Sequence, residues 1–125
     1  MESDLVATDS SGITLAICKE NRISCYTPFS DGFRDLPREG IALKPYGLYF
    51  AGTDGYFYLL LTSGILKKLT PDFSNTTFNL LSEERQFHNK PILSAFHENN
   101  HIFIVDTDNK LYRQQVDGSG KEIPV

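Results

Sequence analysis

The sequence predicts an all-β protein built from about three four-stranded antiparallel sheets, and three observations lead to this prediction. Residues 101–120 read as an apolar strand, a tight turn, a second strand and a second turn. The same order of strands and turns occurs upstream, in residues 48–64. Leu59–Leu61 is an unbroken apolar run, which is typical of a strand covered on both faces. Repeated antiparallel units that stack on one another explain all three observations.

Length and composition favour a single folded domain that spans residues 1–125. The chain has 40% hydrophobic and 22% charged residues, a balance that excludes a disordered protein. Its net charge of −4 and its scattered basic residues argue against a nucleic-acid partner. Because the sequence has no long apolar segment, we expect neither a signal peptide nor a membrane partner, and the default expectation is cytoplasmic localisation.

The first predicted unit covers residues 4–37, where short strands alternate with turns rich in glycine and polar residues. Its predicted strands are Asp4–Thr8, Ile13–Lys19, Ile23–Phe29 and Phe33–Leu36. Cys18 and Cys25 lie on either side of the second turn. They face each other if that turn centres on Asn21-Arg22, and they do not if it centres on Glu20-Asn21. We expect two small buried thiols in a reducing compartment.

The second predicted unit covers residues 40–70 and contains the strongest hairpin signal in the chain. Its predicted strands are Ile41–Lys44, Leu48–Thr53, Tyr56–Thr62 and Ile65–Thr70. Asp54-Gly55 joins the two middle strands, because a type I′ turn needs positive φ angles that glycine adopts readily.

Residues 71–90 interrupt the repeat and are predicted to be an insertion, because the segment is too long for an ordinary connection. Within the insertion, Leu80–Phe87 is predicted to form one or two helical turns, with Ser82 as the N-cap.

The third predicted unit covers residues 91–125. Its predicted strands are Pro91–Phe96, Ile102–Val105, Leu111–Val116 and Lys121–Val125. His97 and His101 flank a turn in this unit, where their side chains would face one another in a hairpin. Two imidazoles without a third ligand make a poor zinc site, so we expect no metal ion.

Residues 102–120, with the sequence IFIVDTDNKLYRQQVDGSG, resemble a blade of the six-bladed β-propellers that have TolB-like or YWTD-type repeats. Ile102–Asp106 corresponds to the YWTD position, and Leu111 and Asp117–Ser119 correspond to the later landmarks of the repeat. The resemblance implies propeller-like blades at about residues 4–37, 40–70 and 91–125. It selects no subfamily, because the signature residues themselves are replaced. The alternative fold is a β-sandwich or a barrel with similar hairpins.

The sequence contains no recognisable catalytic or cofactor-binding motif. Ser11, Ser63 and Ser119 lie beside glycines, but each falls in a predicted turn and none belongs to a G-x-S-x-G pattern. Asp106–Asn109 lacks the remaining oxygen ligands of a calcium loop. We therefore expect a protein that is not an enzyme and that holds no cofactor.

Three blades do not close a ring, and an open row of sheets exposes an apolar face at its end. The predicted function is therefore a non-enzymatic protein-interaction or scaffolding module, which is completed by self-association into a homodimer or by a protein partner. One alternative is a lectin-like propeller that binds a small carbohydrate, with Tyr46, Tyr49 or Tyr56 stacking on the sugar. Another alternative is the propeller fragment of a larger enzyme.

The candidate binding residues lie in loops that are predicted to converge on one face of the molecule, together with the turn at Glu20-Asn21. Three of them are in hairpin turns and three are in the insertion: Asp54, Asp108, Asn109, Arg85, Phe87 and His88.

Overall fold

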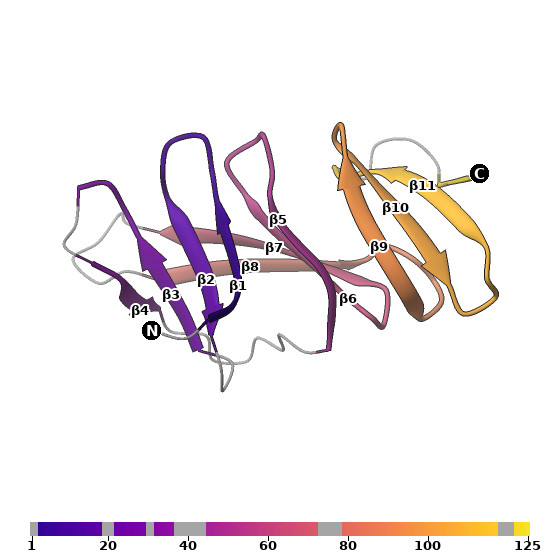
Figure 1. Cartoon of the computed structure of the whole chain (residues 1–125), viewed down its shortest axis with the longest axis horizontal. Helices are drawn as coiled ribbons and strands as arrows, with labels where there is room; N and C mark the ends of the chain where they lie inside the picture. The colour runs from indigo at the N-terminus through magenta and orange to yellow at the C-terminus, as the bar shows by residue number, and fades with distance from the viewer. Residues whose placement is uncertain (1–2, 19–21, 30–31, 37–44, 73–78, 118–121) are drawn as a thin grey trace.

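The computed structural model describes residues 3–18, 22–29, 32–36, 45–72, 79–117 and 122–125. Strands dominate these residues and form three four-stranded antiparallel sheets, which confirms the predicted all-β class (Figure 1). The strands are β1 (Ser3–Thr8), β2 (Thr14–Cys18), β3 (Arg22–Tyr26), β4 (Arg34–Leu36), β5 (Tyr46–Ala51), β6 (Phe57–Leu61), β7 (Ile65–Asp72), β8 (Asn79–Gln86), β9 (Ile92–Glu98), β10 (His101–Asp106), β11 (Leu111–Gln115) and β12 (Ile123–Pro124).

Each sheet is made of four strands that are consecutive in the chain and hydrogen-bonded in chain order. The first sheet contains β1 to β4, the second β5 to β8 and the third β9 to β12. Tight turns make this possible: between β9 and β10, Asn99 and Asn100 both adopt positive φ angles, of 50° and 64°. The four strands predicted for the first unit and the four predicted for the third unit are all present.

The second sheet differs from the prediction in its outermost strand. Residues 79–86 form β8, which pairs with β7 over its whole length, so the predicted helical turns at Leu80–Phe87 are wrong. The register explains the strand, because it sets Lys67 opposite Glu84 and Lys68 opposite Glu83, and opposite charges stabilise a cross-strand pair. Residues 71–72 and 79–86 of this segment therefore belong to strands of the second sheet. The predicted strand at Ile41–Lys44 lies outside the described residues.

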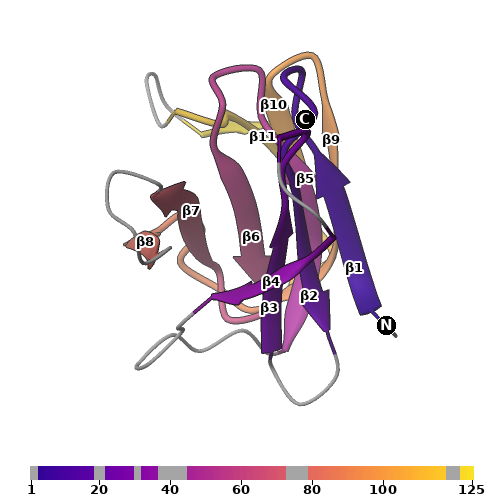
Figure 2. The same ribbon diagram turned by 90° about the vertical axis from the view of Figure 1, so that its left-hand side faces the viewer.

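The three sheets stack face to face, with the second sheet in the middle (Figure 1). β5 lies against both β1 and β9, so the first strands of the three sheets are neighbours. Figure 2 shows these first strands on one side of the molecule and β7 and β8 on the other. We call the face of the first and second sheets that is turned toward the following sheet the front face, and the opposite face the back face. In the third sheet, the back face is turned toward the second sheet and the front face points away from it.

Two apolar layers hold the sheets together. Between the first and second sheets, buried side chains such as Leu15 and Ile17 of β2 pack with Phe57 and Leu59 of β6. Between the second and third sheets, buried side chains from β6, β7, β10 and the end of β11 pack together, and these are Tyr58, Leu60, Leu66, Ile102, Ile104 and Val116. Burying one such side chain stabilises the fold by about 1.5 to 3 kcal/mol.

β6 is the only strand of the described chain whose five residues are all buried, because its side chains alternate between the two apolar layers. This observation confirms the prediction from Leu59–Leu61 that the strand is covered on both faces. Tyr49 of β5 adds a polar link, since its hydroxyl donates a hydrogen bond of 2.7 Å to the carbonyl oxygen of Leu15 in the first sheet.

The front face of the third sheet is apolar and remains exposed. Phe96 of β9 lies directly opposite Phe103 of β10, and the two rings stack with centroids 4.7 Å apart. Phe96 is 50% exposed, and Ile123 of β12, in the same cross-strand row, is 48% exposed. Val105 and Leu111 form the next row. We call the surface formed by these five side chains the open face.

The two cysteines are free and buried, as predicted. They do not face each other, because the register of β2 and β3 sets Cys18 opposite Arg22 and Cys25 opposite Leu15. Burial, together with the negative charge of Asp9, raises the pKa of Cys25 to about 11. The thiol is therefore neutral at physiological pH.

The two histidines of the third unit do not face each other either. His97 lies opposite Ile102, and His101 lies opposite Glu98. The ring of His97 stacks instead on Phe50 of the second sheet, with centroids 3.9 Å apart, and burial lowers the pKa of His97. Within the described part of the chain, no helix is long and apolar enough to cross a membrane.

Candidate functional site

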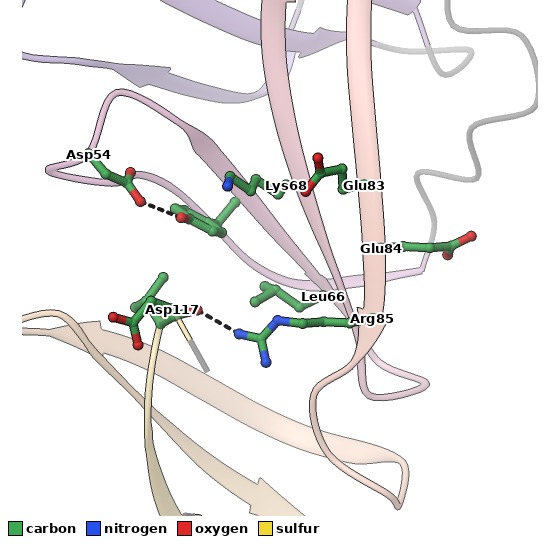
Figure 3. A pocket seen from close by; sticks show the side chains of 9 residues that line it. Asp54, Leu66, Lys68, Glu83, Glu84, Arg85 and Asp117 are labelled. Carbon is green, nitrogen blue, oxygen red and sulfur yellow. Dashed lines mark hydrogen bonds between the residues drawn. The ribbon is translucent and has the colours of Figure 1, made fainter. Parts of the chain in front are cut away.

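A pocket with a volume of about 280 Å³ lies between the second sheet and the end of β11 (Figure 3). Most of its wall is the front face of the second sheet, and its far side is the chain that follows β11. Its lining residues are Asp54, Tyr58, Leu66, Lys68, Glu83, Glu84, Arg85, Val116 and Asp117. Among the candidate residues predicted from the sequence, Asp54 and Arg85 therefore lie in one pocket.

Asp54 is held in place by the hairpin that joins β5 and β6. Its carboxylate accepts a backbone hydrogen bond from Tyr56 at 3.2 Å and one from the hydroxyl of Tyr58 at 2.5 Å. Burial and the hydrogen bond to Asp54 raise the pKa of Tyr58, so the phenol keeps its proton. The carboxylate and the phenol form a fixed acceptor–donor pair at one end of the pocket.

Arg85 connects the second sheet to the third. Its guanidinium donates a hydrogen bond of 2.6 Å to the carbonyl oxygen of Val116, just beyond β11. The same group lies 4.9 Å from the centroid of the Phe87 ring, which is buried in the apolar layer below. Phe87 is thus a core residue that supports Arg85 and is not an exposed contact.

Lys68 and the two glutamates of β8 complete the charged wall. The ammonium group of Lys68 lies 3.8 Å from the centroid of the Tyr56 ring, and Glu83 is its cross-strand neighbour. Figure 3 shows Glu84 pointing away from the pocket. That carboxylate instead lies 3.5 Å from the ammonium nitrogen of Lys67 on the back face of the sheet.

His88 lies outside this pocket, in a buried cluster with two carboxylates. Its Nε2 atom is 2.9 Å from Asp106, and its Nδ1 atom is 2.5 Å from Glu122. Tyr112 covers the ring at a centroid distance of 4.9 Å. If both carboxylates are ionised, only the doubly protonated ring donates to both. This cluster joins the end of β8 to both β10 and the start of β12, and it leaves the ring no free nitrogen.

Asp106 is fully buried, and its two carboxylate oxygens accept hydrogen bonds from three residues. Its second oxygen accepts the backbone N–H groups of Asp108 at 2.9 Å and Lys110 at 3.3 Å. Burial alone would raise the pKa of Asp106, but the hydrogen bonds from His88 and from these two backbone groups outweigh it. The pKa of Asp106 is therefore lowered.

Asp108 and Asn109 lie far from Asp54. They occupy the turn between β10 and β11, at the opposite end of the sheets from the turn between β5 and β6 (Figure 1). Asp108 forms an ion pair with Lys90, and Asn109 adopts a positive φ of 60° that the turn requires. The expectation that these turns share one loop face is therefore wrong, and the turn at Glu20-Asn21 lies outside the described residues.

Sequence reasoning missed Tyr58, Lys68 and Glu122. Tyr58 donates a hydrogen bond to Asp54, Lys68 lines the pocket that contains Asp54 and Arg85, and Glu122 lies beside His88. The only available signal was the alternation of β6, which places Tyr58 and Asp54 near one another once the hairpin is drawn. Within the described ranges, no group of three or more histidine, cysteine or acidic side chains is arranged to hold a metal ion.

Comparison with known protein families finds no matching family model, and comparison with curated proteins finds no match. Any functional conclusion therefore rests on the geometry of the chain itself.

Proposed function

We propose that this chain is a non-enzymatic protein-interaction module, and that the open face binds an antiparallel sheet of a protein. One observation carries the proposal. The front faces of the first and second sheets are each covered by the following sheet, whereas no sheet formed by the described residues covers the front face of the third sheet. The open face thus repeats, at the end of the row, a surface that is a packed interface elsewhere in the chain.

The composition of the open face supports this role. Stacked aromatic rings supply a large and rigid apolar area, which is typical of the centre of protein interfaces. A shallow hollow of about 340 Å³ adjoins it, lined by Glu98, Asn99, His101, Phe103 and Arg113. Apolar side chains beside such a polar rim form the usual anatomy of a binding surface. The stacked sheets and their neighbouring first strands also support a propeller-like arrangement of blades.

The test compares Phe96→Asp with the control Leu81→Asp. Both residues are apolar and similarly exposed, at 50% and 54%, but Leu81 lies on β8 and outside the open face. A photoreactive residue at Ile123 reports which protein covers the surface. We expect cross-links from this position to a protein in cells that produce the chain, with Phe96→Asp abolishing them and Leu81→Asp preserving them. Absence of any cross-linked protein would refute the proposal.

The pocket of Figure 3 favours a second candidate function, the binding of a small carbohydrate. The pocket offers carboxylate, ammonium, guanidinium and phenol groups, and its volume suits a small ligand. The proposed stacking residues support it less, because Tyr49 bonds across the first interface and Lys68 covers the ring of Tyr56. Titration with monosaccharides, monitored by NMR, tests this function, since binding should shift the Lys68 signals in the unmodified protein but not in Asp54→Ala.

A further inference from the structure

We propose that the protein covering the open face is a second copy of this chain, which contributes the back face of its first sheet. Two copies would then associate head to tail, with each using its third sheet at one contact and its first sheet at the other. This inference rests on the proposed function and names its partner.

The packing inside the chain dictates how such a contact is aligned. Between the second and third sheets, first strand lies against first strand, because Phe50 of β5 stacks on His97 of β9. β1 and β5 are neighbours in the same way. Continuing this arrangement places β9 on β1 of the second copy, β10 on β2, β11 on β3 and β12 on β4.

An exposed apolar residue on each surface meets its counterpart in this alignment. The cross-strand row on the open face carries Phe96 and Phe103. The corresponding row on the back face of the first sheet carries Val6, Ala16 and Ser24. Ala16 and Ser24 are already buried within the chain, whereas Val6 is 55% exposed. Because β9 lies on β1 in this alignment, the half-exposed ring of Phe96 would cover Val6.

Charges at the outer end of the same rows also match. Arg113 lies beside Phe103 on β11 and is exposed. On the first sheet, Asp35 of β4 lies beside Ser24, which donates a hydrogen bond of 2.5 Å to its carboxylate. The Asp35 side chain is 64% exposed, with Arg22 at 3.7 Å. An arginine from a second copy thus meets a carboxylate that is already positioned, and such pairs select the correct partner and register.

A head-to-tail contact between unlike surfaces either closes into a ring or continues as a filament. With two copies, closure uses both surfaces of both chains and covers both open faces. The proposal is therefore a closed pair, with a mass twice the 14.1 kDa of one chain.

Charge reversal at the two surfaces tests the head-to-tail arrangement. We expect Arg113→Asp alone and Asp35→Arg alone to weaken the pair at least about tenfold, because each sets like charges opposite one another. Mixing the two variants should restore a pair in equal proportion. In the mixed pair, one contact carries the exchanged charges and the other is unaltered. Light scattering over a range of concentrations measures the mass of the unmodified protein, of each variant and of their mixture.

A second measurement does not depend on the folding of either variant. In a protein that carries neither charge reversal, a photoreactive residue at position 123 of β12 should cross-link to β4 of a second copy. Mass spectrometry of mixed heavy and light chains identifies this cross-link.

Three results would overturn the second-copy inference: a monomer at all concentrations, an open-ended series of masses, or a mixture that does not regain the pair. A monomer whose Ile123 position cross-links to another protein would leave the proposed function intact. A monomer with no cross-link would remove both.

Discussion

At the scale of single residues, the contacts between the second and third sheets depend on a few positions with no room for change. Gly64, in the turn between β6 and β7, is one of them. Its carbonyl oxygen accepts backbone hydrogen bonds from Phe87 at 2.9 Å and from His88 at 3.1 Å. Its φ is +93°, and an added Cβ atom would lie 2.2 Å from the carbonyl oxygen of His88. The turn therefore anchors the chain that delivers His88 to its carboxylates.

Gly64→Ala should lower the free energy of unfolding by about 2 to 4 kcal/mol, because it combines a strained φ with a backbone clash. Gly55→Ala is the matched control. It has a similar φ of +87°, but nothing lies within 4 Å of the added Cβ atom, so only the conformational cost of about 1 kcal/mol is expected. Urea denaturation of both variants gives the comparison, and equal losses would contradict the clash.

Asp106→Asn should destabilise the protein at neutral pH and should change how its stability depends on pH. The pKa of Asp106 is lowered in the folded protein, so this residue contributes stability that is fully present above its unfolded pKa of about 3.9. That contribution is lost as the pH falls through the lower folded value. The free-energy difference between the two proteins should therefore be largest at neutral pH and shrink below about pH 4. A constant difference would show that the charge of Asp106 has no part in it.

At the scale of elements, β8 shows what the sequence alone was unable to reveal. Strands of the first and third units were predictable, because turn residues bound short apolar runs. β8 carries the polar run Ser82–Gln86, which has no clear alternation of apolar residues. It is a strand because β7 supplies a complete ladder of partners, and the charges of that partner strand lie too far away in sequence for a local pattern to report them.

Glu84→Lys should cost about 1 to 2 kcal/mol of folding stability, because it sets a second ammonium group opposite the buried Lys67. Glu83→Lys is the control on the other face of the same strand, where Lys68 remains partly exposed and where we expect a loss of less than about 1 kcal/mol. Thermal unfolding at low and high salt measures both changes. A larger loss for Glu83→Lys would contradict the importance of the buried ammonium.

At the scale of the whole molecule, the stacking of sheets was predictable, whereas the location of the site was not. The apolar run in β6 indicated a strand with both faces covered, and the structure confirms it. No local pattern indicates that Arg85 reaches Val116 or that His88 reaches Glu122, because each contact joins different sheets. The prediction placed the turns at Asp54 and Asp108 at the same end of the sheets for a similar reason. The hairpin turns at Asp54 and Asp108 have similar sequences, but they follow a first strand and a second strand respectively.

If two copies form a closed pair, thermal stability should increase with protein concentration. Unfolding then separates the chains, so mass action favours the folded pair. A tenfold increase in concentration corresponds to about 1.4 kcal/mol and should raise the midpoint by about 4 °C. Differential scanning calorimetry at two concentrations measures the shift. Because Arg113→Asp weakens the pair, it should lower the midpoint at both concentrations, and an unchanged midpoint in that variant would contradict the assigned contact.

The burial of β6 on both faces also has a consequence for the order in which the protein forms during synthesis. Ribosomes make the first sheet, then the second and then the third, but β6 needs Ile102 and Ile104 to cover its second face. Until those residues emerge, Tyr58 and Leu60 remain exposed to water, and the nascent chain carries an apolar surface that promotes aggregation. Completion of β10 is therefore the step at which the second face of β6 becomes covered.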